Sequence, residues 1–127
     1  MQPPLQVIFN DVVEIRMGSP FNTCNIKLVG DIDLSLPRYS WQDKFAWSKD
    51  YKFLILICWA NDSFGPAFKI IAINTSTKEI LESTSIKGAI ISLSVKKETV
   101  FYRKFFYDTS LKESNESFEF FKLHDAK

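Results

Sequence analysis

The stretch that decides the fold is residues 51–59, which read Tyr51-Lys-Phe-Leu-Ile-Leu-Ile-Cys-Trp59. Successive side chains of a β-strand point to opposite faces of its sheet. Here both alternating sets are apolar, one beginning at Phe53 and the other at Leu54. A strand that is apolar on both faces is usually covered on both faces. The stretch therefore predicts a central strand that lies between two layers of structure.

Short runs of alternating apolar and polar residues continue on both sides of this strand, separated by Gly, Pro, Asn and Asp. Such runs are typical of β-strands joined by turns. Besides 51–59, the predicted strands cover residues 5–9, 12–17, 23–29, 32–36, 44–48, 67–74, 78–83, 89–95, 99–107 and 118–123. We expect loops at 38–43, 61–66 and 108–117, and a hairpin turn at 96–98. No segment keeps a helical apolar period, and the best helix candidate is a single turn at 38–44.

These elements predict an all-β protein. Roughly eight to ten short strands with frequent turn signals are typical of an antiparallel β-sandwich or a meander barrel. The aromatic content of 15% agrees with this class, because aromatic side chains favour the half-buried surface of a sheet. With 127 residues, we expect a single β domain over 1–127.

Composition and charge narrow the classes of function. The formal net charge is +1, whereas nucleic-acid-binding domains usually carry a strong basic excess. The amino-terminal segment has neither the basic nor the apolar region of a signal peptide, and no apolar run is long enough to span a bilayer. We therefore expect a cytoplasmic protein that does not bind membranes and is a poor candidate for binding nucleic acid.

The sequence offers no recognisable catalytic or metal-binding pattern. His124 is the single histidine and lies close to the carboxyl terminus, so a catalytic triad has no support. Cys24 and Cys58 are far apart and lack the spacing of a zinc site. Cys58 lies within the apolar stretch and is predicted to be a buried free thiol. We expect a protein that is not an enzyme and that needs no cofactor and no metal.

Aromatic and acidic residues gather in the segments predicted as loops around the central hairpin. Exposed aromatic side chains are enriched at the centres of protein interfaces. The candidate contact residues are Tyr39, Trp41, Asp43, Asp62 and Phe64, with a second patch at Glu113 and Glu116. Two alternatives stay open: the aromatic side chains fold back over the core, and the acidic segment is only a solvated surface.

A second strip combines basic and aromatic residues, beginning at Lys96-Lys97 and continuing through Phe101-Tyr-Arg-Lys-Phe-Phe-Tyr107. Proteins that bind single-stranded nucleic acid stack bases on aromatic side chains beside basic ones. The same alternation is expected of a strand that packs one face on the core. The pattern alone leaves both interpretations open.

Residues 45–82 resemble part of a β-propeller blade. The resemblance rests on Phe45-Ala-Trp-Ser-Lys-Asp50 before the central strand and on Phe68-Lys-Ile-Ile-Ala-Ile-Asn-Thr-Ser-Thr-Lys78 after it. A propeller needs at least about four blades of roughly 40–50 residues, which is more than this chain holds. The resemblance therefore implies a meander of sequential hairpins.

By its size, class and overall character, the chain also resembles the small all-β immunity proteins of contact-dependent growth inhibition. This resemblance implies a protein that binds a bacterial toxin one to one and covers its active site. Many such toxins are nucleases, here expected to be an RNase, and acidic loops would complement a positive substrate cleft. Two other classes stay open: a single-stranded nucleic-acid-binding domain and a barrel that binds an apolar ligand.

Overall fold

The computed structural model describes residues 3–14, 22–62, 65–108 and 113–125, and for those at 61, 62, 65, 107, 108, 113, 114 and 125 only the backbone. Within these ranges the chain forms ten antiparallel strands in two sheets, followed by a short 3-10 helix. The strands are β1 (Leu5–Glu14), β2 (Asn22–Gly30), β3 (Trp41–Trp47), β4 (Phe53–Asp62), β5 (Gly65–Asn74), β6 (Ile80–Glu82), β7 (Ile86–Lys87), β8 (Ala89–Lys96), β9 (Thr99–Asp108) and β10 (Glu113–Lys122), and the helix is η1 (Leu123–Asp125).

The predicted central strand is confirmed. In the seven-stranded sheet the order is β1-β2-β3-β4-β5-β6, with β7 also pairing with β5, so β4 has a neighbour on each side. Ile55 and Ile57 pack into one apolar cluster, and Leu54 and Leu56 pack into another on the opposite face. The sheet order follows the chain order, as expected for a meander.

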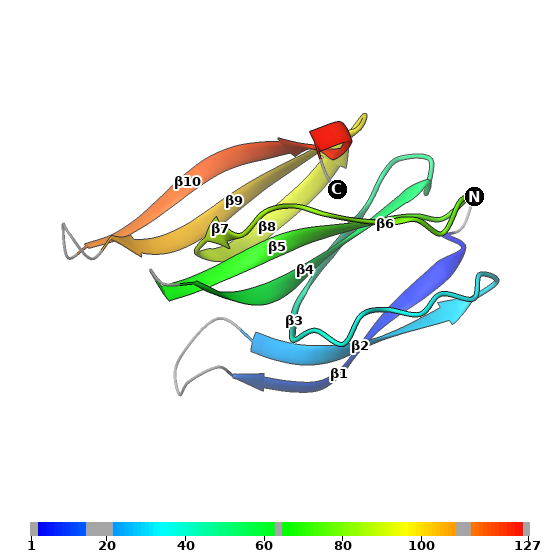
Figure 1. The fold of residues 1–127 in the computed structure, drawn as a ribbon, viewed down its shortest axis with the longest axis horizontal. Helices are drawn as coiled ribbons and strands as arrows, with labels where there is room; N and C mark the ends of the chain where they lie inside the picture. Colours follow the sequence, from blue (N-terminus) through cyan, green and yellow to red (C-terminus); the bar gives the residue numbers. More distant parts are fainter. Residues whose placement is uncertain (1–2, 15–21, 63–64, 109–112, 126–127) are drawn as a thin grey trace.

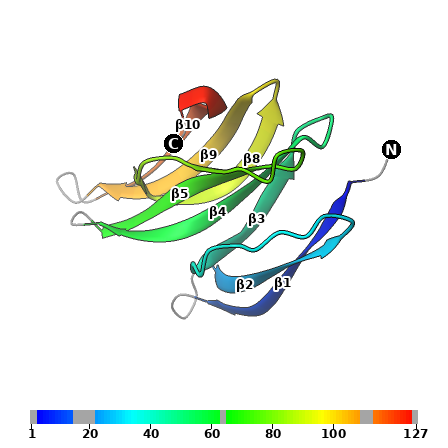
Figure 2. The same ribbon diagram turned by 45° about the vertical axis from the view of Figure 1, so that its right-hand side comes forward.

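The second sheet covers one face of β4 and β5. It has the order β10-β9-β8, and Figures 1 and 2 show it lying against these two strands. Phe68 of β5 meets Tyr102 of β9 edge to face, with 5.8 Å between the ring centroids. At one margin the Ile90 N–H donates to Gln42 Oε1 over 3.2 Å, which links β8 to β3. Apolar side chains thus fill the space between the two sheets.

The opposite face of β4 and β5 is covered by the seven-stranded sheet itself. A single residue pair, Cys24 with Trp41, joins β2 to β3, and beyond it the β1–β2 hairpin turns back over the face (Figure 2). Ile26 and Leu28 of β2 pack against the cluster that contains Leu54. The protein is therefore two packed sheets and is not a closed barrel.

The predicted strand at 32–36 is wrong. Residues 31–40 form a connection outside any strand that crosses from β2 to β3, with backbone hydrogen bonds at its two ends, from the Asp31 N–H to Pro4 O and from the Trp59 N–H to Ser40 O. Leu34 and Leu36 still pack against the apolar cluster, whereas Asp33 and Ser35 are exposed. The alternation in the sequence marks side chains that point inward, and this occurs without backbone pairing.

Several other observed strand and loop boundaries differ from the predicted ones. The predicted loop at 61–66 is largely an extension of the β4–β5 hairpin, since Asn61 pairs with Pro66. The predicted loop at 38–43 gives way to β3 from Trp41, and no helical turn forms there. The last strand begins at Glu113, five residues before the predicted start at Phe118, because β10 pairs with β9 along its whole length. Pairing with a long neighbour, which the local composition does not show, extends these strands.

Candidate functional site

Tyr39 and Trp41, two of the predicted contact residues, lie together but differ in exposure. Their rings are 5.6 Å apart, and the Tyr39 hydroxyl donates to Glu82 Oε1 over 3.0 Å. This hydrogen bond raises the pKa of Tyr39. Trp41 is only 3% exposed and belongs to the apolar cluster with Cys24, so its ring folds back onto the core. Its role as a direct contact stays a prediction.

Asp43 is held by neighbours at the start of β3. Its carboxylate accepts hydrogen bonds from Asn22 Nδ2 at 3.0 Å and from Lys44 Nζ at 3.3 Å. Burial raises its pKa, but the hydrogen bond from Asn22 and the charge of Lys44 outweigh burial and hold the pKa below its usual value. Asp43 is thus ionised and positioned by the fold at neutral pH.

Of the other predicted contact residues, the structure describes the side chain of Glu116 but not those of Asp62, Phe64 and Glu113. Phe64 lies outside the described residues, as do the side chains of Asp62 and Glu113. Glu116 is exposed on β10, opposite Phe105 of β9. The structure therefore places Tyr39 in the 31–40 connection with its ring against Trp41, places Trp41 and Asp43 on β3 of the seven-stranded sheet, and places Glu116 on the other sheet.

The outer side of the three-stranded sheet carries an exposed group of phenylalanines. Phe118 is 83% exposed, Phe120 is 60% exposed and Phe101 is 43% exposed. Val100 and Tyr102 of β9 point toward the core, so the alternate residues Phe101 and Arg103 point outward with the β10 rings. We call the outward-facing residues Phe101, Arg103, Phe118 and Phe120 the aromatic face.

Strand pairing brings the aromatic face together in neighbouring rows. Phe101 lies opposite Phe120 across β9 and β10, with ring centroids 6.3 Å apart. Arg103 lies opposite Phe118 in the next row. On β8 the same rows end in the small side chains of Ser94 and Ser92, which leave the rings uncovered on that side. The result is a group of exposed rings around Arg103 on one sheet face, and gathered apolar exposure is a feature of interaction sites.

Arg103 gives this surface an unsatisfied polar group. Its Nε is buried and has no hydrogen-bond partner among the residues that the structure describes. An unpaired buried donor costs free energy. Lys96 and Lys122 flank the rings at one end of the sheet and Glu116 at the other, so the surroundings are of mixed charge.

The inner side of the same sheet is internally satisfied. Lys104 Nζ lies 3.0 Å from Glu119 Oε2, and the hydroxyls of Tyr102 and Ser117 also donate to this carboxylate. Burial raises the pKa of Glu119, but these hydrogen bonds and the Lys104 charge outweigh burial and lower the pKa overall. Burial and the same carboxylate raise the pKa of Tyr102. The polar groups of this network bind one another on the inner side, whereas the phenylalanine rings of the outer face are exposed to solvent.

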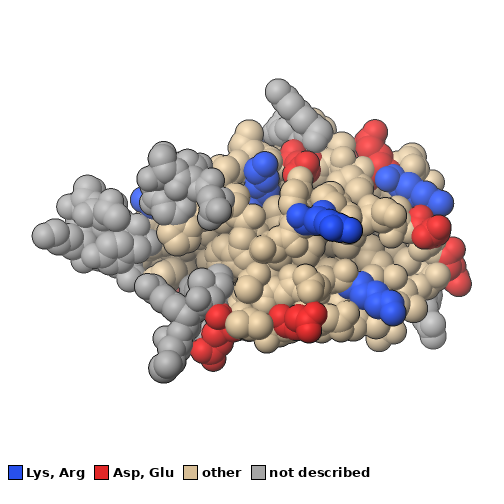
Figure 3. Space-filling model, turned by 60° about the horizontal axis from the view of Figure 1, so that its bottom comes forward, with Lys and Arg blue, Asp and Glu red and all other residues tan. Residues whose placement is uncertain are grey.

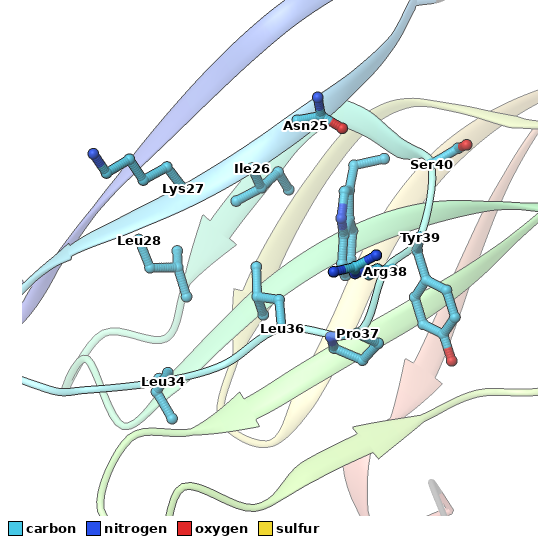
Figure 4. A pocket seen from close by; sticks show the side chains of 11 residues that line it. Asn25, Ile26, Lys27, Leu28, Leu34, Leu36, Pro37, Arg38, Tyr39 and Ser40 are labelled. Atoms are coloured by element: carbon cyan, nitrogen blue, oxygen red, sulfur yellow. The ribbon is translucent and has the colours of Figure 1, made fainter.

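A shallow hollow of about 630 Å³ lies between β2 and the 31–40 connection. Figure 4 shows Leu28 and Leu36 pointing toward each other across it, and Tyr39 and Arg38 stand at its end. In Figure 3, which looks at the β1–β2 side, Lys/Arg and Asp/Glu side chains are interspersed without an area of one sign. The hollow is open to solvent, in contrast to the enclosed cavity of a ligand-carrying barrel.

Both cysteines are free and buried, which confirms the expectation for Cys58. Burial raises the pKa of each thiol to about 11. The nucleophile in thiol chemistry is the thiolate, so a high pKa suppresses reactivity. The structure thus supports a packing role for these residues.

We expect native-state labelling of Cys24 and Cys58 to be slow. Raising the thiol pKa from 9.0 to about 11 lowers the thiolate fraction at pH 8 roughly 100-fold before restricted access is counted. The measurement is the absorbance rise with a chromogenic disulfide reagent, with and without denaturant. Rapid labelling of the folded protein would contradict the buried placement.

Comparisons of the chain with protein-family models, with curated proteins and with solved structures find no match. Among the described residues, no group of three or more His, Cys, Asp and Glu side chains is arranged to hold a metal ion. No helix in the described ranges is long and apolar enough to cross a membrane.

The sequence carried part of the signal for the aromatic face. The basic and aromatic residues at Lys96-Lys97 and 101–107 single out the strip but do not tell which of its two faces meets the core. Phe118 and Phe120 were predicted only as part of a final strand, because Phe121 beside them is equally apolar. Their exposure depends on which neighbour β10 pairs with and on which side of it the other sheet lies.

Proposed function

We propose that this chain is a protein-binding domain that neutralises a bacterial toxin through the aromatic face. The observation that carries the proposal is the cluster of exposed rings of Phe101, Phe118 and Phe120 on one sheet face. Such apolar area is costly to leave in water and forms the buried centre of an interface when a partner covers it. Arg103 lies in the same face, opposite Phe118.

The toxin as partner comes from the resemblance in size and class to small immunity proteins. Of the residues predicted from the sequence, Glu116 lies beside the aromatic face and is a candidate for its rim. A charged rim residue mainly changes the association rate, whereas the central rings supply the affinity. The proposal therefore assigns binding strength to Phe118 and Phe120 and electrostatic steering to Glu116.

The test uses the product of the gene immediately upstream as the candidate toxin. We expect co-expression of this chain to protect cells from it, and the double variant Phe118→Ser/Phe120→Ser to lose protection. Removing one anchoring ring typically costs about 2 kcal/mol, so each change should weaken binding roughly thirtyfold. Affinity is measured by titration calorimetry on purified proteins.

The matched control is Phe45→Ser. Phe45 is 41% exposed on β3, outside the three-stranded sheet, so its loss should leave affinity unchanged. If Phe45→Ser weakens binding as much as the β10 variants do, or if the β10 variants bind normally, the assignment to the aromatic face is wrong.

A second candidate is single-stranded nucleic acid. The observation that favours it is the position of Arg103, Lys96 and Lys122 around exposed rings on which bases could stack. Fluorescence anisotropy with labelled oligo(dT) and oligo(U), at low and high salt, separates the candidates. Salt-sensitive binding that depends on both Arg103 and Phe118 would favour nucleic acid.

A further inference from the structure

The free edge of β10 is a feature that the proposed function leaves unused. β10 is the last strand in the order β10-β9-β8, and Figures 1 and 2 show it at the rim of the protein. Its pairing with β9 is regular from Glu113 to Lys122, without a bulge or a proline. Long regular edges invite pairing with another strand, and proteins usually block them. Among the described residues nothing pairs with the outer edge of β10.

The outward-facing residues of β10 are complementary to themselves when the strand is reversed. In chain order they read Glu116, Phe118, Phe120 and Lys122, which is acid, ring, ring, base. A second copy that runs antiparallel presents base, ring, ring, acid. With Glu119 on the twofold axis, Glu116 lies opposite Lys122 of the second copy and Phe118 lies opposite its Phe120.

We propose that the chain forms a symmetric dimer by antiparallel pairing of β10 with β10 of a second copy. Each dimer then contains two Glu–Lys pairs and two Phe–Phe pairs on the outer face. Directly opposed side chains of these kinds stabilise antiparallel strands. The paired edge also satisfies backbone groups that a free edge leaves to water.

The charge pattern selects one register. A shift of two residues in one direction places Glu116 opposite Phe120, and a shift in the other direction places Lys122 opposite Phe118. Either shift loses both ion pairs. A shift of one residue places the outer face of one copy beside the inner face of the other.

The inner face of β10 is compatible with this register. Glu119 of the two copies would face each other, and opposed like charges weaken a strand pair. Each Glu119 is already paired with Lys104 at 3.0 Å and accepts hydrogen bonds from Tyr102 and Ser117. The lysine of each copy therefore offsets the repulsion at the twofold axis.

The dimer would join the two small sheets into one continuous sheet and place two aromatic faces side by side. It depends on the edge of β10 and not on which partner binds the face. A one-to-one complex with a toxin would then contain two copies of each protein. The dimer can therefore be absent while toxin binding through the aromatic face is present, and the reverse.

The test is sedimentation equilibrium over a range of protein concentrations, with circular dichroism of every variant as a check on folding. We expect the unmodified chain to dimerise reversibly. Lys122→Glu opposes two pairs of glutamates and should weaken dimerisation roughly tenfold or more, and Glu116→Lys should do the same with lysines. Both side chains are exposed, so the monomer should stay folded.

The decisive variant is the combined Glu116→Lys/Lys122→Glu. It restores a self-complementary order of base, ring, ring, acid, and should recover dimerisation close to that of the unmodified chain. The matched control is Lys49→Glu, a charge reversal at an exposed position between β3 and β4, which should leave dimerisation unchanged.

Three results would overturn the dimer. They are a monomer at every concentration, single reversals that dimerise normally, and a combined variant as weak as the single ones. Toxin protection by the charge variants is measured in parallel. If the unmodified chain protects cells but is a monomer at every concentration, the dimer is wrong and the proposed function stands, whereas a dimer that responds to the charge changes as expected without any protection has the reverse meaning.

Discussion

Replacing Trp41 with alanine should lower the free energy of unfolding by about 3–5 kcal/mol, the usual cost of removing a large buried aromatic side chain. Trp41 is 3% exposed and packs in the cluster formed by β2, β3, β4 and β5. It also provides the single residue pair that joins β2 to β3, through Cys24. Its loss therefore removes packing at the point where the β1–β2 hairpin turns over the sheet.

Urea denaturation followed by circular dichroism measures this change, and Phe45→Ala is the control on the same strand. Phe45 is 41% exposed, so its truncation should cost less than about 1 kcal/mol. The pair also separates the two interpretations of Trp41. If Trp41→Ala keeps its stability but loses affinity for a partner, Trp41 is a direct contact and the structural interpretation is wrong.

Replacing Phe68 with alanine should also lower the free energy of unfolding by about 3–5 kcal/mol, here in the apolar cluster between the two sheets. Phe68 is fully buried between the sheets and meets Tyr102 edge to face at 5.8 Å. The cavity would lie where the three-stranded sheet rests on β5. We therefore expect the variant to loosen this contact, which a rise in proteolysis of the native protein would report.

Phe118→Ala is the matched control for Phe68→Ala. Phe118 is 83% exposed and lies on the outer side of the three-stranded sheet, so the change should alter stability by no more than about 0.5 kcal/mol. A large loss of stability in Phe118→Ala would show that the ring is part of the core. A small one would show that the ring contributes little to the stability of the fold.

The two faces of β9 show what the sequence predicts about a strand and what it does not. Its alternation of Phe101, Arg103 and Phe105 with Tyr102 and Lys104 predicts a strand with two different faces. Both sets contain aromatic and basic side chains, so hydropathy does not tell which set is buried. In the structure Val100 and Tyr102 pack in the core against the other sheet, so Lys104 lies on the inner side by alternation and pairs there with Glu119 of β10. A partner distant in the sequence decides the orientation.

The connection at 31–40 and the strand β10 both show that local composition does not predict backbone pairing. In the first a strand-like pattern is not paired, and in the second a loop-like composition is. Leu34 and Leu36 have the alternation of a strand but pack without backbone pairing, while Glu113 to Ser117 have the composition of a loop but are paired with β9. Backbone hydrogen bonding depends on a neighbouring strand being in reach. Local composition carries no information about that neighbour.

The sequence by itself determined the all-β class and the central strand at 51–59, because burial on both faces requires apolar residues at every position. It also determined that Cys58 is a buried thiol, since Cys58 lies in the middle of that stretch. Only the tertiary structure decided that Trp41 lies in the core and that Phe118 and Phe120 lie in solvent. The physical reason is that exposure depends on which sheet covers which face, and that choice is made by packing between segments distant in the chain.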